Sequence, residues 1–263
     1  MIVDGRALAK EVCARTKARA EKLPHRPKVI AYVAHDPTPA MRSYLNIKKR
    51  MAETAGCVFE ETKDPTFFRD ADAVIVQLPT TPEATVALNA IKVEQDADVL
   101  SKTARKKFEN GDRDALLPPV IAAISEIFRA YGVEPKGKHA VVIGAGFLVG
   151  QPAAVWLRKK LATVSTVTDP TNLERYLKDA DIIISGAGSP HIIKPEMLKQ
   201  GAVLVDAGTS ESSGVIVGDA DPACATKCSV FTPVPGGVGP LAVACLFENA
   251  VTLAERAGGD LTE

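Results

Sequence analysis

Tyr44 and Lys48 combine side chains that can take part in proton transfer with a spacing that brings them together. They lie four residues apart in a segment, 41–56, whose apolar residues recur as on one face of a helix. Both side chains should therefore share a face of that helix. A lysine whose pKa is lowered by partial burial can serve as a general acid or base near neutral pH. The alternative is an exposed tyrosine–lysine pair on a solvated surface.

Gln77 and Asp98 are two further polar residues next to apolar sequence. Gln77 lies near the end of an apolar segment, 73–78, that is typical of a strand. A buried amide there costs free energy unless it meets a partner or a ligand, and a satisfied amide at a strand end is the alternative. Asp98 follows in the polar segment 94–116 and on its own does not differ from any other acid in a loop.

The sequence VVIGAGFLVGQP is typical of a strand, a glycine turn and a helix. Gly144 and Gly146 would form the tight turn and let the backbone approach a pyrophosphate. The helix N-terminus would then offer free N–H groups to that anion. In the general dinucleotide motif the third glycine falls at 149, but here Val149 stands there and Gly150 comes one position late. A purely structural strand–turn–helix is therefore the alternative.

Two more features lie after predicted strands of the same half of the chain. Asp169 follows the strand predicted at 163–167, where an acid can hydrogen-bond the adenosine ribose and would repel a 2′-phosphate. It would equally well cap the helix that follows. The stretch Gly186-Ala187-Gly188 follows the strand predicted at 181–185, at the carboxyl edge where ligands bind in such sheets.

The elements that must position these residues alternate between short apolar runs and helical patterns. This alternation predicts an α/β fold with parallel sheets. Strands are expected at 28–35, 57–62, 73–78, 139–143, 163–167, 181–185 and 202–206. Helices are expected at 41–56, 83–91, 120–130, 149–161, 172–178 and 241–256. The segment 94–116, with its basic run at 102–107, is interpreted as a solvated connector.

The bulk composition excludes several classes of protein. The chain has 263 residues, 46% hydrophobic and 24% charged, and a formal net charge of zero. These values fit one large or two modest globular domains and do not favour a nucleic-acid partner. The N-terminal sequence lacks the pattern of a secretory signal, and the longest apolar runs are short of the ~20 residues that span a bilayer. The five scattered cysteines predict reduced thiols in a cytoplasmic protein and no metal site.

The stretch TPVPGGVGPLAVACLFENAV at 232–251 is the most specific in the chain, because three prolines and three glycines crowd into 233–240. It resembles the signature of the methylenetetrahydrofolate dehydrogenase/cyclohydrolase family, and nearly the whole chain shares that resemblance. Four other stretches agree in order: Pro39-Ala40-x-x-x-Tyr44-x-x-x-Lys48, Val76-Gln77-Leu78-Pro79, Asp96-Ala97-Asp98, and Val142-Ile143-Gly144 through Val149-Gly150-x-Pro152. The late glycine at 150 is the spacing this family uses.

The resemblance implies an α/β protein of two domains. A folate-binding catalytic domain would comprise residues 1–118 and 241–263, and a Rossmann-like nicotinamide-binding domain residues 119–240, with the C-terminal helix returning to the first. It implies an enzyme of one-carbon metabolism that oxidises 5,10-methylenetetrahydrofolate with NAD or NADP and then hydrolyses the methenyl product to 10-formyltetrahydrofolate. Family members are usually homodimers. The partners expected are the folate and the cofactor, without nucleic acid or membrane.

The resemblance also implies roles for individual residues. Lys48 would handle protons, Gln77 would orient it, Tyr44 would stack on the folate, and Asp98 would hold the pterin ring. The substrate-binding residues would be Tyr44, Gln77, Asp98, Pro235, Gly236 and Gly237. The cofactor-binding residues would be Gly144, Ala145, Gly146, Val149, Gly150, Asp169, Gly186, Gly188 and Thr232. This assignment requires Lys48, Gln77 and Asp98 to converge on one site.

Several positions depart from the family pattern. Met41 replaces a serine, Val99 replaces a glycine after Asp98, and Pro118-Pro119-Val120-Ile121 replaces a Pro-Cys-Thr-Pro stretch. Thr168-Asp169-Pro170-Thr171 lacks the arginine and serine that would grip a 2′-phosphate, so the sequence favours NAD over NADP. The region before 73–78 is short, which predicts that one helix is trimmed. Two alternatives are a dehydrogenase of another pterin carrier and a non-catalytic derivative of the enzyme.

Overall fold

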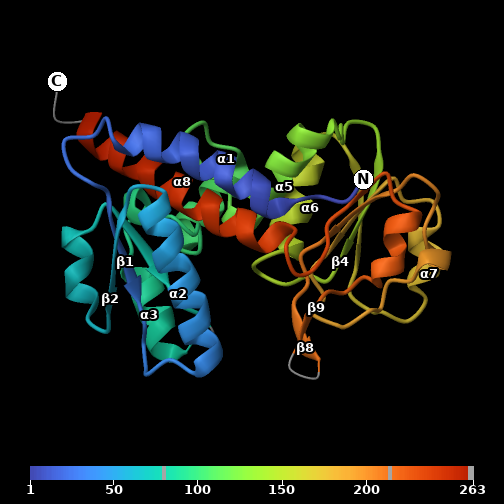
Figure 1. Cartoon of the computed structure of the whole chain (residues 1–263), viewed down its shortest axis with the longest axis horizontal. Coiled ribbons are helices and arrows are strands. Elements are labelled where there is room, and N and C mark those ends of the chain that lie inside the picture. The colour runs from blue at the N-terminus through green and yellow to red at the C-terminus, as the bar shows by residue number, and fades with distance from the viewer. Residues whose placement is uncertain (79–80, 213–214, 260–263) are drawn as a thin grey trace. The chain divides into compact units, whose positions relative to one another are not determined.

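A computed structural model of the chain describes residues 1–78, 81–212 and 215–259. The chain divides into two compact units, and each contains strands and helices (Figure 1). We call residues 9–119 and 243–263 the lysine unit, and residues 1–8 and 120–242 the glycine-turn unit. Helices α1 (Gly5–Ala20) and α8 (Val238–Gly259) each contribute to both.

The lysine unit is built on a three-stranded parallel sheet in the order β2-β1-β3. Its strands are β1 (Lys28–Tyr32), β2 (Val58–Thr62) and β3 (Ala73–Val76). Its helices are α2 (Pro39–Thr54), α3 (Pro82–Ala90) and α4 (Lys102–Asn110), with 3-10 turns η1 (Pro65–Asp70) and η2 (Val93–Gln95). The link from β2 to β3 is the short turn η1, which accords with the short sequence before β3.

Helix α2 begins and ends on clear local signals. The Thr38 hydroxyl accepts a hydrogen bond from the Met41 amide at 3.3 Å, and Pro39 occupies the first turn, where its missing N–H costs nothing. Gly56, in a left-handed conformation, follows the helix end. The helix buries Met41 and Leu45, and this fixes which face carries Tyr44 and Lys48.

The core of the lysine unit lies between its sheet and the second half of α8. Phe247 and Val251 of α8 are fully buried together with Val29 of β1 and Ile75 of β3. From Ala9 onward, α1 runs beside α8, as Figure 1 shows, and Arg15 forms a 2.7 Å ion pair with Glu248. The C-terminal helix thus returns to the unit that holds the N-terminal strands, as predicted.

The glycine-turn unit contains a five-stranded parallel sheet in the order β10-β7-β6-β4-β5. Its strands are β4 (His139–Ile143), β5 (Thr163–Val167), β6 (Ile182–Ser185), β7 (Val203–Asp206) and β10 (Val230–Phe231). Its helices are α5 (Pro119–Tyr131), α6 (Gly150–Lys159) and α7 (Leu173–Leu177), with 3-10 turns η3 (Pro195–Met197) and η4 (Pro222–Thr226). It also contains an antiparallel strand pair, β8 (Ser210–Ser212) with β9 (Val215–Val217). β6 and β7 are buried along their whole length, as their unbroken apolar runs predict.

The predicted α/β fold with parallel sheets is confirmed, and β4 and β5 have the bounds that the sequence indicates. One expectation needs correction, and one helix was missed. The supposed connector 94–116 contains α4, which Ser101 caps at its start and Gly111 ends in a left-handed conformation. The N-terminal helix α1 was not anticipated. Pro79, the last residue of the stretch Val76-Gln77-Leu78-Pro79, lies outside the described residues.

Within the described ranges, one helix has the length and hydropathy that could cross a membrane, Val238–Gly258 in α8. Of its most apolar window, 61% is buried inside the protein, which is typical of a core helix in a globular fold.

Candidate active site

Lys48 and Gln77 meet in the lysine unit. The Lys48 ammonium donates a hydrogen bond to the Gln77 side-chain oxygen at 3.1 Å. The Gln77 amide group donates in turn to the Leu78 carbonyl at 3.0 Å, which fixes which end of the amide faces the lysine. Gln77 directly follows β3 and is buried, and its backbone N–H continues the sheet ladder to Tyr32. The β-sheet therefore fixes the position of Gln77, and the Gln77 side chain orients the Lys48 ammonium through its hydrogen bond.

Asp98 interacts with Lys48 through the attraction of their opposite charges. Burial lowers the pKa of Lys48, and the nearby Asp98 carboxylate opposes that shift. Burial raises the pKa of Asp98 to about 6, against the effect of Lys48, while Asp96 adds to the rise. The structure therefore brings Lys48, Gln77 and Asp98 together, with both ionisable groups displaced toward neutral pH. Groups tuned in this way can exchange a proton with a ligand.

Tyr44 lies one helical turn before Lys48 on α2. Its ring is 45% exposed, although a tyrosine usually buries much of its apolar surface. An exposed ring beside a partly desolvated lysine is available to cover a flat ligand. The spacing of four residues predicted this shared face.

The loop that carries Asp98 is tightly held. Asp96 is buried, and its carboxylate accepts from the amides of Leu100 at 3.2 Å and Ser101 at 2.7 Å. Val99 has a φ of 56°, a left-handed conformation that is strained for a β-branched residue. The glycine that the family has at this position would adopt this φ without strain. Val99 therefore keeps the backbone conformation of the loop but raises its conformational free energy.

The glycine turn follows β4 in the glycine-turn unit, as predicted, and its spacing has a steric reason. A Cβ at Gly150 would overlap the carbonyl oxygen of Gly144, so the first turn of α6 can close on the loop only with glycine at 150. Gly144 has a φ of 90°, and a Cβ there would come within 2.8 Å of the Gly186 carbonyl oxygen. By contrast, a Cβ at Gly146 would approach only the Gly186 oxygen, at 4.0 Å. The close packing therefore sits beneath the turn, and its outer side at Gly146 stays open to a ligand.

The stretch 186–189 after β6 lies against that turn, and one buried carboxylate shapes it. Asp219 accepts hydrogen bonds from the Ser185 hydroxyl at 2.6 Å and from the amides of Ala187 and Ser189, both at 2.8 Å. The side chain of Val149 packs on Gly186. Sequence analysis missed Asp219 because an acid in an unassigned loop carries no signal of its distant partners.

Thr232 and the stretch 235–237 also lie in this unit. Thr232 is fully buried, and its hydroxyl accepts from the Asp206 amide at 2.7 Å. Asp206 itself accepts from the amides of Gly208 and Ala220, and burial raises its pKa to about 6. The Thr232 amide also donates to the Leu204 carbonyl at 3.1 Å, so both the hydroxyl and the amide of Thr232 bond to β7. Its contact with a cofactor stays a prediction. Gly237 donates to the Pro233 carbonyl at 2.8 Å, which closes the loop around Pro235 and Gly236.

Asp169 lines a hollow at the carboxyl end of β5. The hollow has a volume of about 490 Å³ and is lined by Thr166, Val167, Thr168, Asp169, Thr171, Asn172, Arg175 and Tyr176. Asp169 accepts from the Thr171 amide at 2.9 Å, and hydrogen bonding with the side chain and then the amide of Thr171 lowers the pKa of the carboxyl. The alternative that it caps the next helix is wrong, because the N-cap residue of α7 is Asn172. Sequence analysis also missed Arg175, which brings a cation to this hollow from α7.

The five cysteines are all buried, and burial raises the pKa of Cys13, Cys57, Cys224 and Cys228. Among the described residues no group of three or more His, Cys, Asp or Glu side chains could hold a metal ion.

Comparison with known proteins identifies this combination of units. Residues 118–258 match the family described as tetrahydrofolate dehydrogenase/cyclohydrolase, NAD(P)-binding domain. The bifunctional protein FolD of Aquifex aeolicus is 33% identical over 97% of this chain and 96% of its own length. The chain belongs to the tetrahydrofolate dehydrogenase/cyclohydrolase family.

Solved structures of this family agree across both units. FolD from Campylobacter jejuni, a methylenetetrahydrofolate dehydrogenase/cyclohydrolase, superposes with a TM-score of 0.89 at 28% identity, covering 98% of this chain and 99% of its own. The Trypanosoma brucei enzyme complexed with NADP and an inhibitor has a TM-score of 0.87 at 29% identity, covering 98% of each chain. The family likeness therefore covers the lysine unit as fully as the glycine-turn unit.

Proposed function

We propose that this protein oxidises 5,10-methylenetetrahydrofolate to 5,10-methenyltetrahydrofolate with a nicotinamide cofactor and hydrolyses the product to 10-formyltetrahydrofolate. Its similarity to FolD proteins over nearly the whole chain supports both activities. The observation that carries the proposal is the 3.1 Å hydrogen bond between Lys48 and Gln77 beside Asp98, because it supplies the proton-handling group that the hydrolysis needs.

The two ligands belong to different units in this proposal. The folate binds to the lysine unit, where Asp98 accepts hydrogen bonds from the pterin ring and Tyr44 covers it. The cofactor, NAD or NADP, binds to the glycine-turn unit, where the open side of the turn at 144–150 receives the pyrophosphate at the start of α6. Pro235, Gly236 and Gly237 lie in the glycine-turn unit, and their expected role in folate binding stays a prediction. Residues 186–188 and Thr232 extend the proposed cofactor site.

Hydride transfer needs mainly alignment of two bound reactants. The hydride leaves the bridging carbon of the folate for the nicotinamide ring and leaves a delocalised amidinium cation. Orientation of this kind can supply up to ~7–11 kcal/mol in ideal systems. Lys48 makes no covalent bond in this step, so its charge and its hydrogen bond to Gln77 act by orientation.

Hydrolysis places a heavier demand on Lys48. Water adds to the cationic carbon and loses a proton, and the ring nitrogen that departs must gain one. An amine whose pKa burial lowers can do both in turn, since it exchanges protons more readily than an exposed lysine. Gln77 keeps that amine directed at the reacting carbon.

NAD is the proposed cofactor. The Asp169 carboxylate, kept ionised by its bond with Thr171, lies at the end of β5, where an acid hydrogen-bonds ribose hydroxyls and repels a 2′-phosphate. The protein is further proposed to act as a homodimer, as its family resemblance implies, and in the cytoplasm, as its scattered cysteines predict.

The test is turnover with the pure protein. Methylenetetrahydrofolate and each cofactor in turn are supplied, and formation of reduced nicotinamide is followed by its absorbance. The loss of added methenyltetrahydrofolate is followed separately. We expect both activities, with a higher kcat/KM for NAD than for NADP. If the protein oxidises another reduced pterin but not methylenetetrahydrofolate with either cofactor, that pterin and not the folate is its substrate.

A further inference from the structure

Asn249 lies in α8, far along the chain from the candidate active site, yet it is hydrogen-bonded to the loop that carries Asp98. Its side-chain amide donates to the Ala97 carbonyl at 2.9 Å and to the Leu117 carbonyl at 2.9 Å. The side chain is only 8% exposed. The Ala97 carbonyl belongs to the peptide bond that joins Ala97 to Asp98, so one of these bonds acts directly on the backbone of the acid.

The loop needs such a restraint because its backbone is strained. Val99, the next residue after Asp98, is buried and holds a φ of 56°. A valine leaves that conformation readily unless its surroundings impose it. Asp96 fixes the far side of the loop through the amides of Leu100 and Ser101. Asn249 is the restraint on the near side.

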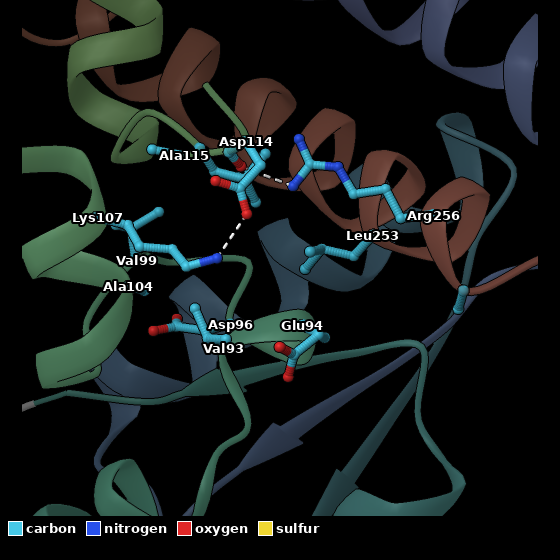
Figure 2. A pocket seen from close by; sticks show the side chains of 12 residues that line it. Val93, Glu94, Asp96, Val99, Ala104, Lys107, Asp114, Ala115, Leu253 and Arg256 are labelled. Carbon is cyan, nitrogen blue, oxygen red and sulfur yellow. Dashed lines mark hydrogen bonds and ion pairs between the residues drawn. The ribbon is translucent and has the colours of Figure 1, made fainter. Parts of the chain in front are cut away.

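Figure 2 shows the surroundings of this loop. Asp96 and Val99 line a pocket of about 360 Å³, and Leu253 and Arg256 of α8 line it as well. The pocket lies beside a loop whose residues Ala97 and Val99 are themselves buried. The hydrogen bonds from Asn249 and to Asp96 therefore act together with packing to hold the loop.

We propose that Asn249 is a positioning residue that sets the orientation of the Asp98 carboxylate toward Lys48 and the pterin ring. This inference rests on the proposed function, which assigns Asp98 to the folate. An asparagine suits the task because its NH2 group has two donors at a fixed angle, one for each carbonyl. An aspartate has no donor when ionised, and an alanine removes the donor to the buried Ala97 carbonyl and to the partly buried Leu117 carbonyl.

The experiment compares Asn249→Ala with Val29→Ala, which removes buried volume from the same core at the start of β1 and touches neither ligand site. Steady-state kinetics are measured with the folate and the cofactor varied in turn. We expect Asn249→Ala to raise the KM for methylenetetrahydrofolate about tenfold and to leave the KM for the nicotinamide cofactor within twofold. Val29→Ala should lower the melting temperature by a similar amount but change neither the folate KM nor the cofactor KM. Equal changes in both KM values, or the same profile in both variants, would overturn the proposal.

A double-variant cycle tests the physical reason. Glycine adopts a φ of 56° without strain, so the loop of Val99→Gly depends less on an outside restraint. The effect of Asn249→Ala on the folate KM should therefore be at least threefold smaller in the Val99→Gly background. An effect of the same size in both backgrounds would show that Asn249 acts in some other way.

Hydrogen exchange separates this inference from the proposed function. The amides of Leu100 and Ser101 should exchange at least tenfold faster in Asn249→Ala than in wild type, and at the wild-type rate in Val29→Ala. Unchanged exchange in Asn249→Ala would refute the restraint even if the enzyme turns over folate. Faster exchange in a protein whose wild type oxidises no folate would support the restraint and refute the proposed function alone.

Discussion

Lys48 and Asp98 carry opposite charges in a partly desolvated site, and burial shifts the pKa of each toward neutrality. Each group also limits the shift of the other, so neither can be altered without changing its partner. Gln77 adds a directional bond that a charge pair lacks, since the amide is itself tied to the Leu78 carbonyl. Lys48, Gln77 and Asp98 should therefore act together, and no single side chain among them carries the chemistry alone.

Replacing the lysine should separate the two proposed reactions. Lys48→Met keeps an apolar side chain of similar length but removes the amine. We expect hydrolysis of methenyltetrahydrofolate to fall by about 10²-fold or more, the range that general acid–base catalysis contributes, and hydride transfer to fall less. Lys49→Met, at the exposed neighbouring position, is the control. An equal loss in separate assays of the two steps would refute this division of labour.

Cofactor choice should depend on a second acid. Asp169→Ala removes the negative charge from the hollow at the end of β5 and leaves Arg175 there. The ratio of kcat/KM for NADP to that for NAD should rise several-fold, because the repulsion of the 2′-phosphate is relieved. Glu196→Gln, an exposed acid in the same unit, should leave that ratio unchanged. If Asp169→Ala also leaves it unchanged, Asp169 does not select the cofactor.

At the scale of elements, two glycine-containing turns after neighbouring strands form one surface. The turn after β4 packs on the turn after β6, and Asp219 shapes the latter by accepting three hydrogen bonds. The proposed cofactor site would therefore depend on an acid that lies outside both turns. Geometry of this kind is set by hydrogen bonds across the sheet edge.

Neutralising Asp219 should weaken cofactor binding selectively. Asp219→Asn presents an NH2 group where an oxygen accepted from the Ala187 amide, so the turn at 186–189 must shift. We expect the KM for the nicotinamide cofactor to rise about tenfold while the KM for the folate stays within twofold. Asp181→Asn is the matched control, because Asp181 also accepts from a backbone amide in this unit, that of His139. A larger change for the folate than for the cofactor would contradict this role.

Elements with strong local patterns could be predicted from the sequence, and those with weak ones could not. β4 and β5 are apolar or β-branched runs with turn residues on either side, and their bounds were found. Helix α1 was missed because the face it buries consists of small or polar residues: Ala9, Val12, Cys13, Thr16 and Ala20. Helix α4 was missed because its basic run suggested solvent, although Arg105 within that run is buried.

The same contrast holds within the candidate site. The spacing of Tyr44 and Lys48 on one helix, and of Gln77 at a strand end, was evident in the sequence. The contribution of Asn249 was not, since its partner Ala97 lies 152 residues away and only the fold brings them together. Asp219 and Arg175 likewise have no local signal that separates them from surface charges.

At the scale of the whole molecule, each unit contains one carboxyl whose pKa burial raises to about 6, Asp98 in the lysine unit and Asp206 in the glycine-turn unit. An aspartate in an unfolded chain has a pKa of about 3.9. The folded state therefore binds more protons than the unfolded state between these values. The stability that protonation of these groups contributes is fully present below pH ~4 and is lost as the pH rises through 6.

Removing one of these carboxyls should flatten that pH dependence. Asp98→Asn is neutral at every pH, so its free energy of unfolding should fall less than that of the wild type between pH 4 and 6, by roughly 1–2 kcal/mol. Urea denaturation across this range measures the difference. Asp112→Asn, an exposed acid of the same unit, should follow the wild-type curve. A parallel curve for Asp98→Asn would mean that the native carboxyl titrates as in the unfolded chain.

The lysine unit is assembled from two separated stretches of chain, and this has a consequence for biosynthesis. Its core includes Phe247, Ala250 and Val251 of α8, which a ribosome adds more than a hundred residues after β3. Until those residues emerge, the face of the three-stranded sheet that packs on α8 lacks these partners. The lysine unit can therefore complete its core only after the strands of the glycine-turn unit, which precede most of α8 in the chain, have been synthesised.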